Sequence, residues 1–302
     1  MTTKANGWSR NQAPEAQRGW RASRARNQKL LRLLTHLILL VGGVVFALPL
    51  FWQLSTSLKP VTQVYNYPPE WIPRPITWSN YPESMKIVPF GLFFRNTTVI
   101  AFFGILGQVL SCSMAGFAFA RLRWWGRDVL FALMLSTMML PYHVTMIPQF
   151  ILFRHFGWVN TLLPLIVPRL FAGAFFTFLM RQFFSTIPRD LDDAAKVDGA
   201  SIFRIYWQII LPMSKPTLAT VAIFTFNSVW NEYLPALIYL NTTEKFTVSL
   251  GLAAFQARAS LGGLRWELMM AATTIVLSPV LIAFVFLQKY FIQGIVITGV
   301  KG

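Results

Sequence analysis

Six long apolar stretches constrain the fold of this chain more than any other feature of its sequence. They cover residues 31–54, 92–120, 129–152, 162–180, 218–240 and 268–287. A helix that crosses a bilayer needs about 20 mostly apolar residues, and each stretch reaches about that length. The sequence therefore predicts an all-α polytopic membrane protein with about six transmembrane helices. The fourth stretch is the least regular, because Pro164, Pro168 and Arg169 interrupt it.

The composition agrees with a membrane protein. Hydrophobic residues make up 55% of the chain and charged residues only 13%, whereas about 25% of a soluble domain is normally charged. The net charge of +16 does not indicate nucleic acid, because the basic residues sit at the ends of apolar stretches and form no aromatic-interleaved patch. Membrane lipid is the expected surrounding. The single cysteine, Cys112, excludes an intramolecular disulfide bond and is expected to be a small buried residue.

The distribution of lysine and arginine predicts the orientation. Residues 1–30 form a basic tail that we expect to be disordered and cytoplasmic, followed by a retained span, since the apolar block is too long for a cleaved signal peptide. One set of alternate connections carries 18 of the 27 basic residues, and the other set carries nine. The positive-inside rule places the richer set, and with it both termini, in the cytoplasm. The permease domain is then residues 31–302.

Three connections differ in character. Residues 59–90 are rich in proline and aromatic side chains, which predicts a stiff, extended external loop without helix. Residues 241–265 are polar and contain Gly251, Gly262 and Gly263, so we expect a second external loop that moves or reaches toward a partner. Residues 181–215 form the longest cytoplasmic connection.

The 181–215 connection reads as two short helices joined by a sharp turn. The first begins near Pro188, with acidic residues in its first turn, and stops at Asp198 and Gly199. Ser201 is placed to cap a second helix that ends at Leu211 and Pro212. The second helix has one apolar face, formed by Ile202, Ile205, Tyr206, Ile209 and Ile210. Periodicity alone is equally consistent with an amphipathic connector lying on the membrane surface.

Residue identities favour a more specific interpretation. The run Asp193-Ala194-Ala195, Gly199, Ile209 and Leu211-Pro212 resembles, in spacing, the EAA loop of binding-protein-dependent ABC importers. Asp193 stands where that family usually has glutamate, so any ion pair made there has a shorter reach. The segments 175–184 and 228–233, with the tail segments 288–294 and 298–302, look like the carbohydrate branch of these permeases. The second membrane subunit of maltose-type importers is the closest match, over roughly residues 30–302.

This resemblance implies a type I ABC importer permease in a prokaryotic plasma (inner) membrane. The cytoplasmic loop would dock on a separate ATPase dimer, and a second, related permease and an extracytoplasmic solute-binding protein would complete the complex. The docking surface would comprise Asp193, Ala194, Ala195, Asp198, Gly199 and Ala200. Force would pass through Ile209, Leu211 and Pro212, and the tail 291–302 would also approach the ATPases.

No catalysis is expected on this chain. It lacks a phosphate-binding G-x-x-x-x-G-K-[ST] loop, so ATP and Mg²⁺ would bind the partner ATPase. It also lacks H-E-x-x-H, and its three histidines are scattered, so we expect no metal site and no cofactor.

Polar residues in the fifth apolar stretch are candidates for a translocation cavity. Glu232 lies near Asn227, Trp230 and Asn231, and an ionisable group within a span is a functional hypothesis by default. In that hypothesis the polar groups line the cavity and Trp230 stacks on a sugar. The alternative is a helix-packing hydrogen bond or a position near the outer interface. Gln108 and Asn96 in the second stretch are weaker candidates.

Three other functions remain open. An ion-gradient-driven transporter often has related halves with broken helices at matching positions, and no such pairing is evident. A membrane-embedded enzyme would need a nucleophile or metal cluster within the spans, and none is evident. An ABC importer for glycerol phosphate, a peptide or an amino acid is harder to exclude. Cavity arginines would favour a phosphate, and Arg169 is the only arginine placed well inside a span and away from its ends.

Overall fold

The computed structural model describes residues 15–261 and 265–299, and every regular element within them is helical. The chain divides into two units, residues 1–55 and 56–302, which we describe separately. The first unit contains most of α1 (Glu15–Ser57). Helix therefore begins at Glu15, within the tail predicted to be disordered, and residues 1–14 lie outside the described part.

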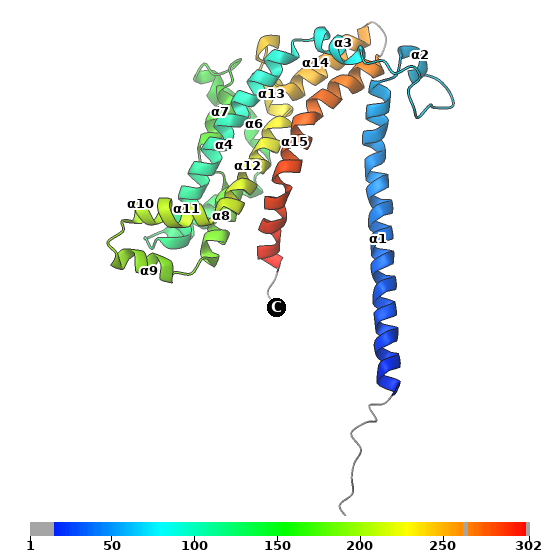
Figure 1. The fold of residues 1–302 in the computed structure, drawn as a ribbon. Helices are drawn as coiled ribbons and strands as arrows, with labels where there is room; N and C mark the ends of the chain where they lie inside the picture. The colour runs from blue at the N-terminus through cyan, green and yellow to red at the C-terminus, as the bar shows by residue number, and fades with distance from the viewer. Residues whose placement is uncertain (1–14, 262–264, 300–302) are drawn as a thin grey trace, which may run out of the picture. The chain divides into compact units, whose positions relative to one another are not determined.

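In the second unit, α4 (Phe90–Arg121) is the central helix (Figure 1). It packs against α8 (Ala174–Thr186) and α12 (Lys215–Trp230), and α12 also packs against α15 (Trp266–Gly299). Glycine lets α8 approach closely, because a Cβ atom at Gly116 would lie only 2.6 Å from the Cβ of Met180. Small residues of this kind let membrane helices pack closely.

The number of apolar spans agrees with the prediction if bent helices are counted as single spans. Four helical segments are long and apolar enough to cross a membrane: Gln28–Ser57, Phe90–Arg121, Leu163–Thr186 and Trp266–Phe286. Two further segments consist of paired helices with a sharp bend. The first pair bends by 100° between η1 (Thr137–Met139), which continues α5 (Arg127–Ser136), and α6 (Tyr142–His155). The bend lies next to Pro141, which cannot donate a helical hydrogen bond.

The fourth and fifth apolar stretches are both interrupted. In the fourth, α7 (Leu163–Ile166) and η2 (Val167–Leu170) are separated from α8 by three non-helical residues. In the fifth, α12 ends at Trp230 and α13 (Leu234–Tyr239) follows after a break at residues 231–233. The expected continuous helix over 218–240 is therefore wrong, and Glu232 lies in the break.

The two connections predicted to be external loops contain helices. Residues 59–90 include α2 (Val61–Val64) and α3 (Asn80–Ile87), and residues 241–265 include η4 (Thr243–Lys245) and α14 (Val248–Leu261). Tertiary packing explains α14, because Val248 and Phe255 are buried in one cluster with Phe90 and Phe93 of α4. Gly262 and Gly263, expected to give this connection mobility, lie outside the described residues.

The connection 181–215 contains α9 (Asp190–Val197), α10 (Ile202–Ile205), the π-helical η3 (Tyr206–Ile210) and α11 (Leu211–Met213). α9 and α10 lie at one end of the second unit, and α3 and α14 lie at the opposite end (Figure 1). The second helix does not end at Leu211 and Pro212 as expected. Pro212 occupies the first turn of α11, where a missing N–H costs little, and the chain bends by 77° into α12 at Ser214.

Candidate functional sites

A pocket of about 500 Å³ lies where the two interrupted stretches face each other. η2 and the start of α8 form one part of its wall, and the break after α12 forms another. Non-helical backbone at membrane depth is tolerated where it is covered by protein or lines a cavity. The two breaks and the pocket are therefore one structural feature.

Gln108 of α4 stabilises the break in the fourth stretch. Its Nε2 donates to the carbonyl oxygens of Arg169 and Phe171, at 3.2 Å each. The neighbouring Gly107 lets η2 lie directly on α4. A Cβ atom at Gly107 would lie only 2.6 Å from the Arg169 carbonyl oxygen. Gln108, a weak cavity candidate from sequence, lines the pocket and also satisfies backbone groups that the break leaves free.

Arg169 and Glu232 form an ion pair in the pocket wall. One terminal guanidinium nitrogen of Arg169 lies 2.7 Å from Oε1 of Glu232, and the other donates to the Leu165 carbonyl at 2.6 Å. Only 17% and 16% of the two side chains are exposed. The pair joins the two interrupted stretches, because Arg169 belongs to η2 and Glu232 follows α12.

The other three cavity residues predicted from sequence do not line this pocket. Trp230 is buried between Phe94 and Phe226, and its Nε1 donates to the Val276 carbonyl of α15 at 3.0 Å. The indole is thus a packing group here and offers no face for stacking on a sugar. Asn227 and Asn231 are exposed and bond to each other, the Asn231 Nδ2 donating to the Asn227 Oδ1 at 2.9 Å.

Asn96, the other weaker candidate, does not line the pocket. It is buried, and its Nδ2 donates to the carbonyl oxygens of Glu244 and Phe246, at 2.8 Å and 3.1 Å. Asn96 therefore ties η4 and the start of α14 to α4.

The second candidate site is the turn between α9 and α10. Gly199 has φ +77°, the left-handed conformation that ends a helix, as the sequence predicts. The Ser201 hydroxyl accepts a hydrogen bond from the Arg204 backbone N–H at 3.2 Å, so the predicted cap is present. Asp193, Ala194, Asp198 and Gly199 are exposed, Ala200 is half-buried, and Ala195 is buried.

The apolar face of the second helix is only partly buried. Ile205, Tyr206 and Ile210 pack with Ala195 in a cluster that includes Phe117, Met180 and Phe184 of α4 and α8. Ile209 and Leu211 lie at the edge of this cluster, whereas Ile202 and Pro212 are exposed. The Tyr206 and Ser113 hydroxyls are 2.7 Å apart and share a buried hydrogen bond.

An arginine at the end of α4 anchors the 181–215 connection. Arg121 lies 3.2 Å from Oδ2 of Asp192 and donates to the Ile187 carbonyl at 2.7 Å, with only 3% of its side chain exposed. From sequence, Arg121 is one of the basic residues that set the topology, and Asp192 is one of the acidic residues in the first turn of the helix. Both side chains face inward, so α9 is held to α4 by a buried ion pair that no local pattern indicated.

The neighbouring Asp193 has a different role in the structure. It is exposed and forms an ion pair with Lys196, one turn further along α9, at 2.9 Å. The Lys196 ammonium donates a hydrogen bond that lowers the pKa of the Asp193 carboxyl. Asp193 therefore offers an ionised carboxylate at the free surface of α9.

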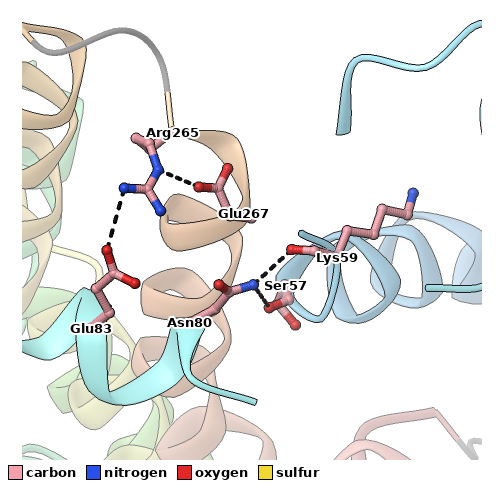
Figure 2. A network of polar contacts seen from close by, with 6 residues as sticks. All are labelled: Ser57, Lys59, Asn80, Glu83, Arg265 and Glu267. Atoms are coloured by element: carbon pink, nitrogen blue, oxygen red, sulfur yellow. Dashed lines mark hydrogen bonds and ion pairs between the residues drawn. The ribbon is translucent and has the colours of Figure 1, made fainter. Parts of the chain in front are cut away.

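At the opposite end of the second unit, polar contacts join α3 to the end of α1 and to the start of α15 (Figure 2). The Asn80 Nδ2 donates to the carbonyl oxygens of Ser57 and Lys59, at 2.9 Å and 2.8 Å. Arg265 pairs with Glu83 of α3 at 3.3 Å and with the buried Glu267 of α15. The network fixes α3 against the start of α15. Within residues 15–261 and 265–299, no group of three or more His, Cys, Asp or Glu residues could hold a metal ion.

Comparison with known proteins gives consistent results. The family model described as "Binding-protein-dependent transport system inner membrane component" matches residues 107–297, which include the pocket and the 181–215 connection. The sn-glycerol-3-phosphate transport system permease protein UgpE of Yersinia enterocolitica is 32% identical over 279 residues, covering 89% of this chain and 98% of that protein.

Two further proteins are similar over most of their length. The galactooligosaccharides transport system permease protein GanQ of Bacillus subtilis is 31% identical over 282 residues, 91% of this chain and 98% of that protein. One chain in the crystal structure of a bacterial ABC transporter involved in import of the acidic polysaccharide alginate superposes with a TM-score of 0.77. It is 25% identical, and the match covers 88% of this chain and 98% of that one.

Proposed function

Because the chain belongs to the family of binding-protein-dependent transport system inner membrane components, we propose that it is one permease subunit of an ATP-driven importer of carbohydrate. The observation that carries this proposal is the family match over residues 107–297, together with relatives aligned over about nine-tenths of the chain. Transport is the function of this chain, and ATP hydrolysis belongs to a separate subunit that binds ATP and Mg²⁺.

In this proposal the α9–α10 turn couples the permease to the ATPase. The exposed residues Asp193, Ala194, Asp198 and Gly199 form the docking surface, with Ala195 and Ala200 behind them. Ile209 and Leu211 transmit the movement, since both pack at the edge of the cluster that joins this turn to α4 and α8. Pro212, exposed at the start of α11, stiffens the connection to α12.

The remaining partners follow from the family. A dimer of ATPases needs two docking turns, so a second, related permease completes the membrane part, and an extracytoplasmic solute-binding protein delivers cargo. The chain lies in the inner membrane of a prokaryote with both termini in the cytoplasm. The tail 291–302 reaches the ATPases; its side chains lie outside the described part of the structure.

Carbohydrate is preferred as cargo over glycerol phosphate for a reason of charge. Both classes occur in the names of similar proteins. A phosphate site needs a cation that is free to pair with it. Among the described residues of the pocket wall, Arg169 is the only arginine, and Glu232 already neutralises it.

Co-purification and transport test the proposal. The tagged chain, extracted in mild detergent, is expected to recover an ATPase and a second permease. Asp193→Lys reverses a charge on the docking surface and should reduce ATPase recovery about tenfold or more, the loss typical of an interface ion pair turned into a repulsion. Glu244→Lys, the same reversal at an exposed residue of η4, is the matched control and should leave recovery unchanged. Recovery of the chain alone, with cargo uptake that persists without ATP, would instead indicate a gradient-driven transporter.

A further inference from the structure

The Arg169–Glu232 pair makes the pocket electrically neutral. Of the described residues that line it, only these two carry a charge at neutral pH. Both terminal nitrogens of Arg169 are engaged, one by Glu232 and one by the Leu165 carbonyl. Separating a partly buried pair leaves two charges without compensation and is costly. An anion therefore meets no net positive charge at Arg169 unless Glu232 is displaced.

The same pair still offers hydrogen bonds to an uncharged ligand. Oε2 of Glu232 makes no hydrogen bond or ion pair within the described residues, so it can accept a hydroxyl proton. Each terminal nitrogen of Arg169 carries a second N–H that can donate. The pair thus presents donors and an acceptor side by side without net charge.

Three hydroxyl groups of the pocket wall lack hydrogen bonds. They belong to Tyr142, Thr225 and Tyr239, and their oxygen atoms are buried without a partner of normal geometry in the described structure. The Tyr142 and Tyr239 hydroxyls interact with each other, although not with normal hydrogen-bond geometry. A buried hydroxyl without a partner is costly, and most buried polar groups in proteins are satisfied. Thr225 therefore lacks a partner among the described residues, and the two phenols have only each other. A ligand that supplies hydroxyl groups can satisfy them once these side chains turn toward the pocket.

The rest of the wall suits the apolar faces of a sugar ring. Phe153, Phe175 and Phe176 line the pocket beside these polar groups, and its volume of about 500 Å³ lies in the range of small-molecule sites. Aromatic walls with a few converging polar groups are the usual composition of such sites.

We propose that this chain itself contacts cargo in this pocket, that the cargo unit is an uncharged polyhydroxyl group such as a sugar ring, and that the Arg169–Glu232 pair selects against anions. The proposal rests on the proposed transport function and specifies its substrate class. Glu232 and Arg169 bind the ligand as a neutral unit, and the hydroxyls of Tyr142, Thr225 and Tyr239 complete the contacts.

A cysteine reporter can test the site in the purified complex. Ser228 lines the pocket and is exposed to it, so Ser228→Cys introduces a reactive thiol. The native Cys112 is fully buried and should give little background. Maltotriose or raffinose, as neutral probes, should slow alkylation of the reporter by N-ethylmaleimide. Trigalacturonate and sn-glycerol 3-phosphate, as anionic probes, should not.

The charge balance is tested on the same reporter. With Glu232→Gln, Arg169 becomes an uncompensated cation. The ratio of labelling rates for an anionic over a cationic methanethiosulfonate should then rise about tenfold, the equivalent of about 1.4 kcal/mol. Arg169→Gln added to Glu232→Gln restores neutrality and should restore the ratio. Glu244→Gln, outside the pocket, should leave the ratio unchanged.

The outcomes separate this proposal from the transport function. Protection by the anionic probes but not the neutral ones, protection by none of the four, or a ratio unaffected by Glu232→Gln would overturn it. The labelling is measured on the complex without ATP, so its outcome does not require ATP hydrolysis or coupling through the α9–α10 turn. The pocket assignment can therefore fail while ATP-driven uptake persists, and loss of ATP dependence would overturn the transport function without changing the labelling result.

Discussion

At the scale of residues, partly buried charges in this protein join elements that are distant in sequence. Arg121 pairs with Asp192 and Arg169 with Glu232, and the more exposed Arg265 pairs with Glu83. Such pairs contribute little net stability compared with apolar packing, but loss of one partner is expensive because the other charge remains buried. They therefore fix relative positions: α9 on α4, η2 on the break after α12, and α3 on α15.

Arg121→Met is expected to destabilise the protein and weaken coupling. It leaves Asp192 buried without its cation, a change that typically costs about 3–5 kcal/mol. The melting temperature of the detergent-solubilised chain should fall by several degrees, and cargo-stimulated ATP hydrolysis by the complex should decrease.

Arg123→Met is the matched control, because Arg123 lies two residues further on and makes no ion pair within the described residues. Equal loss of melting temperature in both variants would mean that the positive charge of this turn matters and the Arg121–Asp192 pair does not.

Gln108→Leu removes the amide that stabilises the break before α8. The carbonyl oxygens of Arg169 and Phe171 lose a donor, which should lower the free energy of unfolding by about 1–3 kcal/mol. Gln149→Leu changes another glutamine of the pocket wall that bonds to none of the described residues, and it should have a much smaller effect. Thermal unfolding of both variants measures the difference. Similar losses of stability in Gln108→Leu and Gln149→Leu would show that the two carbonyl oxygens do not depend on Gln108.

Local signals in the sequence predicted local structure well. Gly199 and Ser201 were assigned to a turn and a cap from their chemistry alone, and both have those roles. The partners of Arg121 and Glu232 could not be predicted in this way, since each lies more than 60 residues away and depends on how helices pack. Trp230 was assigned to the cavity because it neighbours Glu232, but the chain turns between them and the two side chains point in different directions.

At the scale of elements, close packing on α4 creates the pocket. η2, just before the break, lies directly on α4 because Gly104 and Gly107 have no side chains. Periodicity did not reveal the breaks, because apolar residues continue on both sides of each, although the second break itself is the polar run Asn231-Glu232-Tyr233. It also missed α14, since the polar and glycine content of 241–265 suggested a loop and only contact with α4 stabilises the helix.

Gly107→Ala should disturb this packing. Its Cβ would lie 2.6 Å from the Arg169 carbonyl oxygen and the Leu170 Cα, both backbone atoms, so η2 has to move away from α4. Overpacking of this kind costs about 1–3 kcal/mol, and uptake should fall as the pocket changes shape. Gly91→Ala in the same helix meets nothing within 4 Å, so unfolding measurements should find it neutral or slightly stabilising. A neutral Gly107→Ala would contradict the close approach.

At the scale of the whole molecule, the docking turn and the pocket share the central helix. Tyr206 and Ile210, near the turn, pack on the end of α4, whereas Gln108 and Gly107 contact the pocket wall from the middle of it. A movement of α9 and α10 therefore reaches the pocket through α4 and α8 as rigid elements, the usual form of such transitions.

This arrangement requires that the docking turn face the cytoplasm, which the distribution of basic residues predicts. Two side chains report it. Tyr67 lies in the 59–90 connection and is 95% exposed, and Trp125 lies between α4 and α5 and is 98% exposed. In spheroplasts, Tyr67→Cys should react with a membrane-impermeant maleimide, whereas Trp125→Cys should react only after the membrane is permeabilised. The unmodified chain is the control, since its buried Cys112 should stay unlabelled. Labelling of Trp125→Cys in intact spheroplasts would place the α4–α5 turn outside the cell. Because Arg121 holds α9 to that end of α4, the α9–α10 turn would then also lie outside, where no cytoplasmic ATPase could bind it.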